Sequence, residues 1–256
     1  MDKVTLISDL HTFSNWGLMH PDYKAKGIMY VPNEMQEWTF DFWKDRVVRS
    51  CKDSDAFVFN GDMIDGKNKY NYGAVGSTDI YEQVDMSEML IDMLPADTPK
   101  FFMKGTGFHS GDEVVAEQLL ADKLGWYYAP EAIIEVCGIR IFSNHFAPHA
   151  QNKAGVLEKK IRELAAAEAC YGKIDVLNLA HNHKFAATIT QSHIGIITPG
   201  FQHKTPYAID KNLIPPSDIG FVDLLIEDRE LITVDRRNVV QSPFGPQVLT
   251  WEESWK

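Results

Sequence analysis

The sequence predicts an α/β fold with a mixed sheet, and three observations support that prediction. Short buried runs rich in β-branched and aromatic residues alternate with segments of helical periodicity. The first two runs, residues 4–7 and 55–60, are separated by a long crossover that contains a helix, which favours parallel pairing. From residue 185 onward, short alternating strands follow one another without helices, which indicates antiparallel strands added to the sheet.

The first half of the chain is expected to contain three strands and three helices. The strands are predicted from apolar runs at residues 4–7, 55–60 and 99–104, and the helices from apolar spacing at residues 33–51, 80–94 and 112–124. Asn33 has the side chain of an N-cap, and Gly125 that of a C-cap. Residues 12–32 are too long for a plain connector and are predicted to be a binding loop or a lid.

The second half is expected to begin with two strands that a tight turn at Cys137 and Gly138 joins. A helix at residues 150–169 and a buried strand at residues 174–179 come next. The later strands are predicted at residues 186–191, 193–198, 221–227 and 230–236. Because no linker separates them from the rest, we expect one domain over residues 1–256, with a tail at 237–256.

Composition narrows the classes of function. The formal net charge of −11 disfavours binding to a long polyanion such as duplex DNA. No apolar run reaches the length of a membrane span and no signal peptide is evident, so we expect a cytoplasmic protein without a membrane partner. The three cysteines are widely spaced, which favours reduced thiols over disulfides.

Polar side chains follow five of the predicted strands, at the point where each strand ends. They are Asp9 and His11, Asp62, His109, His145, and His181 with His183. Any one of them could be a capping carboxylate or a hydrogen-bonded core histidine. Open α/β sheets bind ligands at the carboxyl ends of their strands, so the recurrence of these residue types favours a metal site there.

The predicted ligands are oxygen and nitrogen atoms without thiolate, which suits Mn, Zn, Fe or Ni. They are more numerous than one ion needs, so two ions that share a carboxylate are expected. Two metals about 3.5–4 Å apart can hold a phosphoryl oxygen and lower the pKa of a bound water. The reaction that follows is hydrolysis of a phosphate ester by metal-bound hydroxide.

The order of these motifs over residues 1 to about 200 resembles the calcineurin-like metallophosphoesterase superfamily. The resemblance implies a four-layer α-β-β-α sandwich, with two mixed β-sheets flanked by helices. It also implies that the strands at about residues 185–236 complete the second sheet. Two divalent ions, Mn foremost, are the cofactors that it implies.

The resemblance also implies residue roles. Asp9, His11 and His183 would hold one ion, and Asp62 would bridge it to the other. His145 and His181 would complete the second site. His109 would contact the phosphate and protonate the leaving group as a catalytic residue. Asp65, which follows in the same motif as Asp62, is expected to hydrogen-bond to the backbone.

Two positions depart from the family pattern. Thr106 occupies the place of an asparagine that ligates the second metal, and two extra residues precede His109. Either the Thr106 hydroxyl is a ligand, or water fills the position, or the second site is weaker. Phe146 follows His145 where the family often has Gly-His, with His149 as a less favoured substitute. The Gly-Thr-x-x-His form resembles phage-type members of the phosphodiesterase and nuclease branch.

The favoured function is hydrolysis of a phosphodiester in a nucleotide or at a nucleic-acid end. The alternatives are a phosphomonoesterase of the same fold, a single-zinc hydrolase and a non-catalytic metal-binding module. Aromatic residues that could hold a base, and lysines that could meet phosphate, are Trp16, Tyr70, Tyr72, residues 201–203, Lys67, Lys69 and Lys104.

Overall fold

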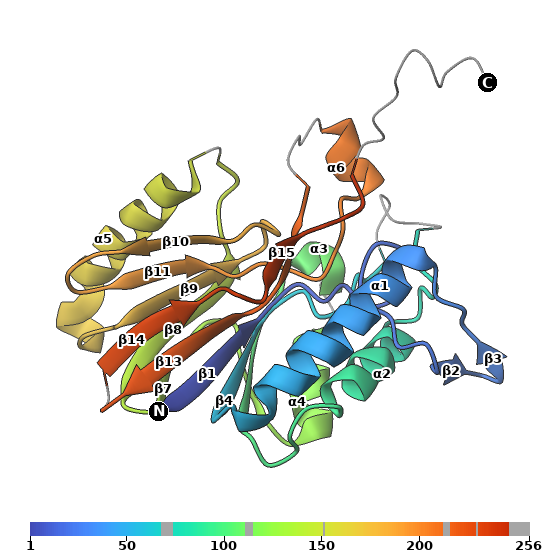
Figure 1. The fold of residues 1–256 in the computed structure, drawn as a ribbon, viewed down its shortest axis with the longest axis horizontal. Helices are drawn as coiled ribbons and strands as arrows, with labels where there is room; N and C mark the ends of the chain where they lie inside the picture. Colours follow the sequence, from blue (N-terminus) through green and yellow to red (C-terminus); the bar gives the residue numbers. More distant parts are fainter. Residues whose placement is uncertain (68–73, 111–114, 151, 212–215, 229, 246–256) are drawn as a thin grey trace.

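The computed structural model of the chain has four layers, and it describes residues 1–67, 74–110, 115–150, 152–211, 216–228 and 230–245. Two mixed β-sheets face each other, and helices cover their outer faces (Figure 1). The predicted four-layer α-β-β-α sandwich is therefore confirmed.

The first sheet has six strands in the order β14-β13-β1-β4-β5-β6. Its strands are β1 (Asp2–Ile7), β4 (Ala56–Asn60), β5 (Lys100–Met103), β6 (Tyr127–Ala129), β13 (Val222–Glu227) and β14 (Glu230–Asp235). β1, β4, β5 and β6 are parallel, as the crossover lengths predict. β13 pairs antiparallel with β1, and β14 pairs antiparallel with β13.

The second sheet has five strands in the order β10-β11-β9-β8-β7. They are β7 (Ala132–Val136), β8 (Ile139–Phe146), β9 (Val176–Ala180), β10 (Ala186–Ile189) and β11 (Ile194–Ile197). β8, β9 and β11 are parallel, with antiparallel strands at both edges. The predicted turn between β7 and β8 has positive φ at Cys137 (54°) and Gly138 (80°), as a two-residue hairpin of type I′ requires.

The helices begin and end at residues that the sequence marks. The main ones are α1 (Glu34–Phe42), α2 (Ile80–Ile91), α4 (Ala116–Leu124) and α5 (Lys153–Tyr171). Asn33 forms a capping box with Gln36 at the start of α1, and Gly125 ends α4 with a left-handed φ of 72°. α1 continues into a π-helical turn, η1 (Trp43–Val48), and a 3₁₀ turn, η2 (Cys51–Asp53).

Shorter elements lie at the ends of the sheets. They are α3 (Gly107–Ser110), α6 (Pro206–Asp210), and two strand pairs, β2 (Lys24–Ala25) with β3 (Ile28–Met29) and β12 (Asp218–Gly220) with β15 (Val239–Gln241). β15 belongs to the predicted tail at 237–256, of which residues 246–256 lie outside the described part.

Alternation along the strands produces three separate cores. On β4, Phe57 and Phe59 face α1, α2 and α4, whereas Ala56 and Val58 face the second sheet. The third core lies under α5, whose Leu157, Ile161 and Leu164 recur at helical spacing. The first sheet is apolar on both faces, so helices cover one face and the second sheet covers the other. Because α5 covers the outer face of the second sheet, four layers form.

One prediction about the layout was wrong. Only β10 and β11 of the C-terminal strands join the second sheet, because β13 and β14 extend the first sheet beside β1. Val222, Leu224 and Ile226 of β13 alternate into the core between the sheets, and this antiparallel neighbour covers an otherwise open edge of β1.

The stretch at residues 12–32 was expected to be a binding loop or a lid, which stays a prediction, but its first part is packed into the core. Phe13 and Leu18 are fully buried, and Met19 and Tyr23 are nearly so. Phe13 contacts the rings of Tyr23 and Tyr30 edge to face. This apolar content gives the segment a fixed position against α1 and α2.

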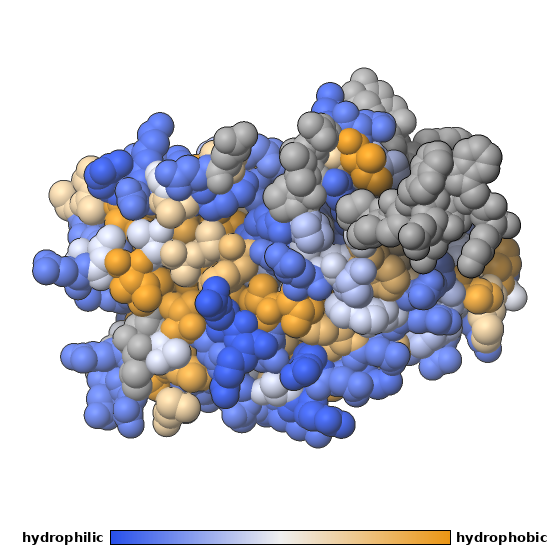
Figure 2. Space-filling model, turned by 45° about the horizontal axis from the view of Figure 1, so that its top comes forward, coloured by the Kyte–Doolittle hydropathy of each residue, from blue (hydrophilic) through white to orange (hydrophobic). Residues whose placement is uncertain are grey.

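The surface carries both hydrophobic and hydrophilic residues. Figure 2 shows hydrophobic residues gathered in a band over the strand-rich half, with hydrophilic residues along the edges. Among the helices that the structure describes, none combines the length and apolar content needed to cross a membrane.

Candidate metal centre

The seven predicted strand-end residues lie together at one end of the sandwich. Asp9 and His11 follow β1, Asp62 follows β4, His145 lies near the end of β8, and His181 and His183 follow β9. His109 comes from α3, just beyond β5. Because both sheets present the carboxyl ends of parallel strands here, side chains from the two sheets meet across the interface.

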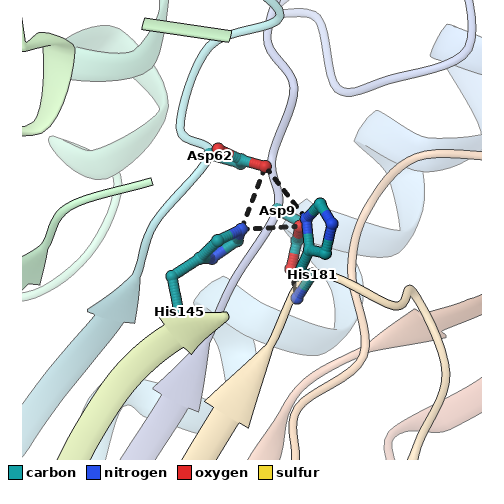
Figure 3. Close-up of side chains that lie close together, drawn as sticks. All are labelled: Asp9, Asp62, His145 and His181. Carbon is teal, nitrogen blue, oxygen red and sulfur yellow. Dashed lines mark hydrogen bonds and ion pairs between the residues drawn. The ribbon is translucent and has the colours of Figure 1, made fainter. Parts of the chain in front are cut away.

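These side chains form overlapping groups that could hold a metal ion. Asp9, Asp62, His145 and His181 make one group (Figure 3), and Asp9, His11 and His183 make a second. His11, Asp62 and His109 make a third. In each group the candidate ligand atoms lie within 4.8 Å of one another.

The backbone of the site adopts a conformation that L-residues rarely take. Five of the seven residues have positive φ, namely Asp9 (51°), His11 (45°), Asp62 (52°), His181 (75°) and His183 (46°). Each such residue costs on the order of 1–3 kcal/mol and persists only where its surroundings impose it. Here the amides of Asp9 and His11 donate to the carbonyls of Gly61 and Asp62, at 3.0 and 3.1 Å.

The carboxylate of Asp9 lies at the centre of the cluster. Its Oδ1 is 3.2 Å from Nε2 of His183, 3.7 Å from Nε2 of His11 and 3.8 Å from Nε2 of His145. This oxygen is buried and has no hydrogen-bond partner among the described residues. A buried acceptor without a donor, surrounded by imidazole nitrogens, suits a divalent cation with mixed oxygen and nitrogen ligands.

The other oxygen of Asp9 is held by the protein. Oδ2 accepts hydrogen bonds from Oγ of Ser8 at 2.5 Å and from the amide of His181 at 3.2 Å. Burial opposes ionisation of Asp9, but the nearby imidazoles of His145 and His183 lower its pKa below the usual value. The carboxylate is therefore charged at neutral pH.

Asp62 faces the second set of imidazoles. Its Oδ2 is 3.0 Å from Nε2 of His145 and 3.8 Å from Nδ1 of His181. Burial would raise its pKa, but His145 and His109 hold the pKa of this carboxyl well below its usual range. Nδ1 of His145 donates to the carbonyl of Asn60 at 2.5 Å, which turns Nε2 toward Asp62.

Thr106 hydrogen-bonds to Asp62. Its amide donates to Oδ1 at 2.6 Å, and its hydroxyl lies 3.1 Å from Oδ1 and 3.3 Å from Oδ2. The residue in the place of the expected asparagine thus orients the carboxylate. A direct ligand role for Thr106 remains a prediction.

Asp65 links two histidines. Its Oδ1 accepts from Nδ1 of His11 and from Nε2 of Gln202, both at 3.0 Å, and its carbonyl accepts from Nδ1 of His109 at 2.9 Å. The predicted bond of this carboxylate to backbone stays a prediction, and the structure adds these two side-chain partners. Burial disfavours a charged imidazole at His11, yet Asp65 and Asp9 raise its pKa to about 10.

At His145, as at His11, burial and nearby carboxylates shift the pKa in opposite directions. Burial lowers the affinity of its ring for a proton, but Asp62 and Asp9 raise its pKa to about 9. His183 differs, because burial outweighs its carboxylate neighbour and lowers its pKa. Binding of a metal ion needs the unprotonated nitrogen, so metal and protons compete for this cluster.

His109 lies against the cluster without entering the Asp9 groups. With Nδ1 bound to the Asp65 carbonyl, Nε2 faces Asp62 Oδ2 at 3.9 Å, and its ring contacts that of His11 edge to face at 4.4 Å. Burial lowers the pKa of His109. Its position allows Nε2 to exchange a proton with a group bound in front of Asp62.

Glu117 on α4 is a residue that sequence reasoning missed. It is fully buried, and its Oε1 accepts a hydrogen bond from the amide of Met63 at 3.2 Å. Burial, with the charge of Asp62, raises its pKa. No pattern marks Glu117, since an acidic residue in the first turn of a helix is ordinary.

Glycines allow the close approach of the strand ends. A Cβ on Gly105 would lie 2.3 Å from the amide and from Oδ1 of Asp62, and one on Gly200 would lie 2.8 Å from Cβ of Asp9. In the sequence, the motifs at Gly61-Asp62 and Gly105 indicated this packing, whereas no motif marked Gly200.

The residues that were predicted to contact a base or a phosphate differ in where they lie. Phe201, Gln202 and His203 are 0%, 5% and 1% exposed, so a base cannot stack on this segment as predicted. Trp16 is half-buried and Lys67 is exposed. Tyr70, Tyr72 and Lys69 lie outside the described residues. His149 contacts the ring of His181 at 5.3 Å.

The chain matches no protein-family model and no curated protein. Solved structures resemble it at low identity. An archaeal phosphodiesterase is 12% identical, with 91% of this chain and 99% of that one covered and a TM-score of 0.48. Vps29 of Entamoeba histolytica, complexed with zinc, is 14% identical over 90% and 88% of the two chains, with a TM-score of 0.43.

A predicted phosphoesterase from Streptococcus pneumoniae is 10% identical, with 94% and 96% coverage and a TM-score of 0.40. At these identities and scores, the likenesses carry no argument about what this chain does. The case for its function therefore depends on the geometry of its own residues.

Proposed function

We propose that the protein hydrolyses a phosphate ester, a phosphodiester by preference, at a centre of two divalent metal ions. The observation that carries the proposal is the position of Asp9 Oδ1. It is a buried, charged oxygen without a hydrogen-bond donor among the described residues, surrounded by imidazole nitrogens of His11, His145 and His183.

The residues divide into two ligand sets. Asp9, His11 and His183 would hold one ion, and Asp62, His145 and His181 would hold the other. Since Asp9 belongs to both groups in the structure, it could share the bridging role proposed for Asp62. Two such ions, Mn by preference, would polarise a phosphoryl group and lower the pKa of a bound water to about 7.

The chain's own groups would orient and protonate the substrate. Asp65 keeps the proton of His11 on Nδ1, so that Nε2 is the atom turned toward the cluster. Thr106 fixes the direction of the Asp62 carboxylate. His109 presents Nε2 beside Asp62, where the ring, once protonated on both nitrogens, would give the Nε2 proton to the leaving oxygen.

The charge of the chain supports a small substrate. A net charge of −11 opposes the approach of a long polyanion, whereas one nucleotide or a strand end carries little charge. A diester is preferred over a monoester on the resemblance of the motifs, and this preference is a proposal.

The test compares hydrolysis of bis-p-nitrophenyl phosphate and p-nitrophenyl phosphate in the presence of Mn. We expect faster turnover of the diester, and a fall of about 10²–10⁴-fold in the His109→Ala variant with its metal content unchanged. His193→Gln is the matched control, because His193 is also buried but pairs with Glu168, on α5.

Other results would support a different function. Faster cleavage of the monoester would indicate a phosphomonoesterase. One bound equivalent at saturating metal would indicate a single-ion hydrolase. Two bound equivalents without turnover of either ester would favour a non-catalytic metal-binding module.

A further inference from the structure

A cleft adjoins the candidate metal centre on the side of β5 and β8. It has a cavity volume of about 340 Å³, and its wall includes Lys104, Thr106, Pro130, Asn144, His145 and Phe146. His145 and Thr106 also contact Asp62, so the cleft opens directly beside the second ligand group. Small-molecule sites begin at about 300 Å³, so this volume suits one nucleotide and not a duplex.

Lys104 supplies the positive charge of the cleft. The described residues that line the cleft include no carboxylate, although the chain carries a net charge of −11. In the part of the chain that the structure describes, the Lys104 ammonium has no ion-pair partner. Its backbone is fixed, because its amide donates to the carbonyl of Ala129 at 3.1 Å. An anionic group is therefore the natural ligand of this ammonium.

Asn144 fixes the wall of the cleft. Its Nδ2 donates to Glu131 at 2.9 Å, and its Oδ1 accepts from the amide of Phe146 at 2.9 Å. With both polar atoms bound, Asn144 is a support for Phe146 and not a ligand group. The backbone amide of Phe146 is thereby held in place.

Phe146 offers an aromatic surface. It is 55% exposed, and its ring lies tilted against that of His181 at 5.2 Å between centroids. Figure 3 shows His145 at the tip of its strand, pointing toward Asp62, and Phe146 is the next residue on β8. A ring exposed to this extent, beside a cationic cleft and next to a candidate ligand, suits stacking on a planar base.

We propose that this cleft binds the nucleoside portion of the substrate, with the base on Phe146 and a second phosphate on Lys104. The inference rests on the proposed function, because the phosphodiester to be cleaved would lie at the metal centre. Lys104 and Thr106 are two residues apart, and therefore within about 7 Å along the chain. One nucleotide can span the step from Lys104 to the metal centre.

Binding of four small probes to the Mn-loaded protein tests the proposal by calorimetry. The probes are adenosine 3′,5′-bisphosphate, adenosine monophosphate (measured as both the 3′ and the 5′ isomer) and ribose 5-phosphate. We expect the bisphosphate to bind about tenfold more tightly than either monophosphate, and adenosine 5′-monophosphate about tenfold more tightly than the sugar phosphate.

Two variants separate the contribution of the second phosphate from that of the base. Lys104→Met should abolish only the preference for the second phosphate, and Phe146→Ala should abolish only the preference for the base. The matched controls are Lys24→Met, on β2, and Tyr171→Ala, at the end of α5 with an exposed ring. Both controls should keep both preferences. Thermal melts check that each variant is folded.

The outcomes distinguish this inference from the proposed function. Equal affinities in the wild type, or preferences that survive both variants, overturn the nucleoside site even if bis-p-nitrophenyl phosphate is hydrolysed. If the preferences are present and depend on Lys104 and Phe146 but no ester is hydrolysed, the nucleoside site stands and hydrolysis is refuted.

Discussion

Nδ1 of His11 donates a hydrogen bond of 3.0 Å to Oδ1 of Asp65, and the same oxygen accepts another from Gln202. Asp65 is 3% exposed, so the pair is shielded from water. The contact fixes both the ring orientation and the tautomer of His11, and thus leaves Nε2 as the atom that would bind the proposed cation.

Asp65→Asn should therefore weaken metal binding without removing a ligand. An amide can donate to Nδ1 and favour the wrong tautomer, so we expect a loss of about 10–100-fold in affinity. Titration calorimetry with Mn measures the loss. Gln202→Leu should have a smaller effect in the same direction. Unchanged affinity in Asp65→Asn would show that His11 is oriented by packing alone.

Metal ions should stabilise the fold. At a free Mn concentration about 100 times the dissociation constant, one site adds about 2.7 kcal/mol to the free energy of unfolding. For a chain of 256 residues this amounts to a rise of roughly 5–10 °C in Tm. Scanning calorimetry with Mn and with a chelator measures it. In Asp9→Asn the difference between the two conditions should nearly vanish, and persistence of the full rise would contradict the role of Asp9.

Gly105→Ala should disrupt the site and the fold together. The added Cβ would meet the amide and Oδ1 of Asp62 at 2.3 Å, so backbone must shift. We expect a loss of about 3 kcal/mol or more in unfolding free energy, measured with urea. Gly125→Ala is the control, since its Cβ would meet nothing within 4 Å and its positive φ alone costs about 1–2 kcal/mol. Equal losses would mean that the contact with Asp62 does not matter.

Thr106→Val should weaken the second metal position. Valine removes the hydroxyl that contacts both oxygens of Asp62 but keeps the backbone hydrogen bond at 2.6 Å. We expect a fall of about 10–100-fold in affinity for the second equivalent of Mn, the equivalent of one hydrogen bond to a charged group. Thr106→Ser should restore it. If serine fails to rescue, the methyl group and not the hydroxyl is what the site uses.

Acid should destabilise the protein through His203. The ring is 1% exposed and lies between Oγ of Thr39 at 2.8 Å and Oγ of Ser242 at 2.7 Å. Burial lowers its pKa to about 4, whereas the unfolded chain keeps a value near 6.5. Between about pH 6.5 and pH 4 the unfolded state therefore binds the proton and the folded state does not.

The resulting loss of stability on acidification reaches about 3 kcal/mol near pH 4. His203→Gln lacks the titrating group, so its unfolding free energy should fall less over the same range. Urea denaturation at pH 7 and at pH 4.5 compares the two proteins. Parallel pH profiles would indicate that His203 can be protonated within the fold.

Much of the fold could be predicted because its signals are local. Asn33, Gly125 and the Cys137-Gly138 turn mark the ends of elements by their own conformational preferences. The side of β1 on which β13 pairs could not be predicted, since alternation of apolar residues does not specify a partner strand. The buried stretch after His11 was missed because its apolar residues follow no regular period.

The cluster of site residues was predictable for a different reason. Parallel strands of one sheet end on one edge, so Asp9 and Asp62 could be placed together, whereas His181 follows β9 of the second sheet and meets them because the two sheets face each other. Glu117 and Gln202 come from a helix and from a segment beyond the strands, and neither carries a motif. Their contacts with the site depend on tertiary packing, which the sequence does not display.

Left-handed backbone conformation restricts how the ends of β1, β4 and β9 would change in evolution. The residues with this conformation are Asp9, His11, Asp62, His181 and His183. Glycine takes this conformation without strain and asparagine with little. A descendant freed from selection for metal binding would thus gain stability by replacing these residues with either one. If the chain has the proposed activity, its loss in a descendant should leave glycine or asparagine at the ends of β1, β4 and β9, while the strands themselves persist.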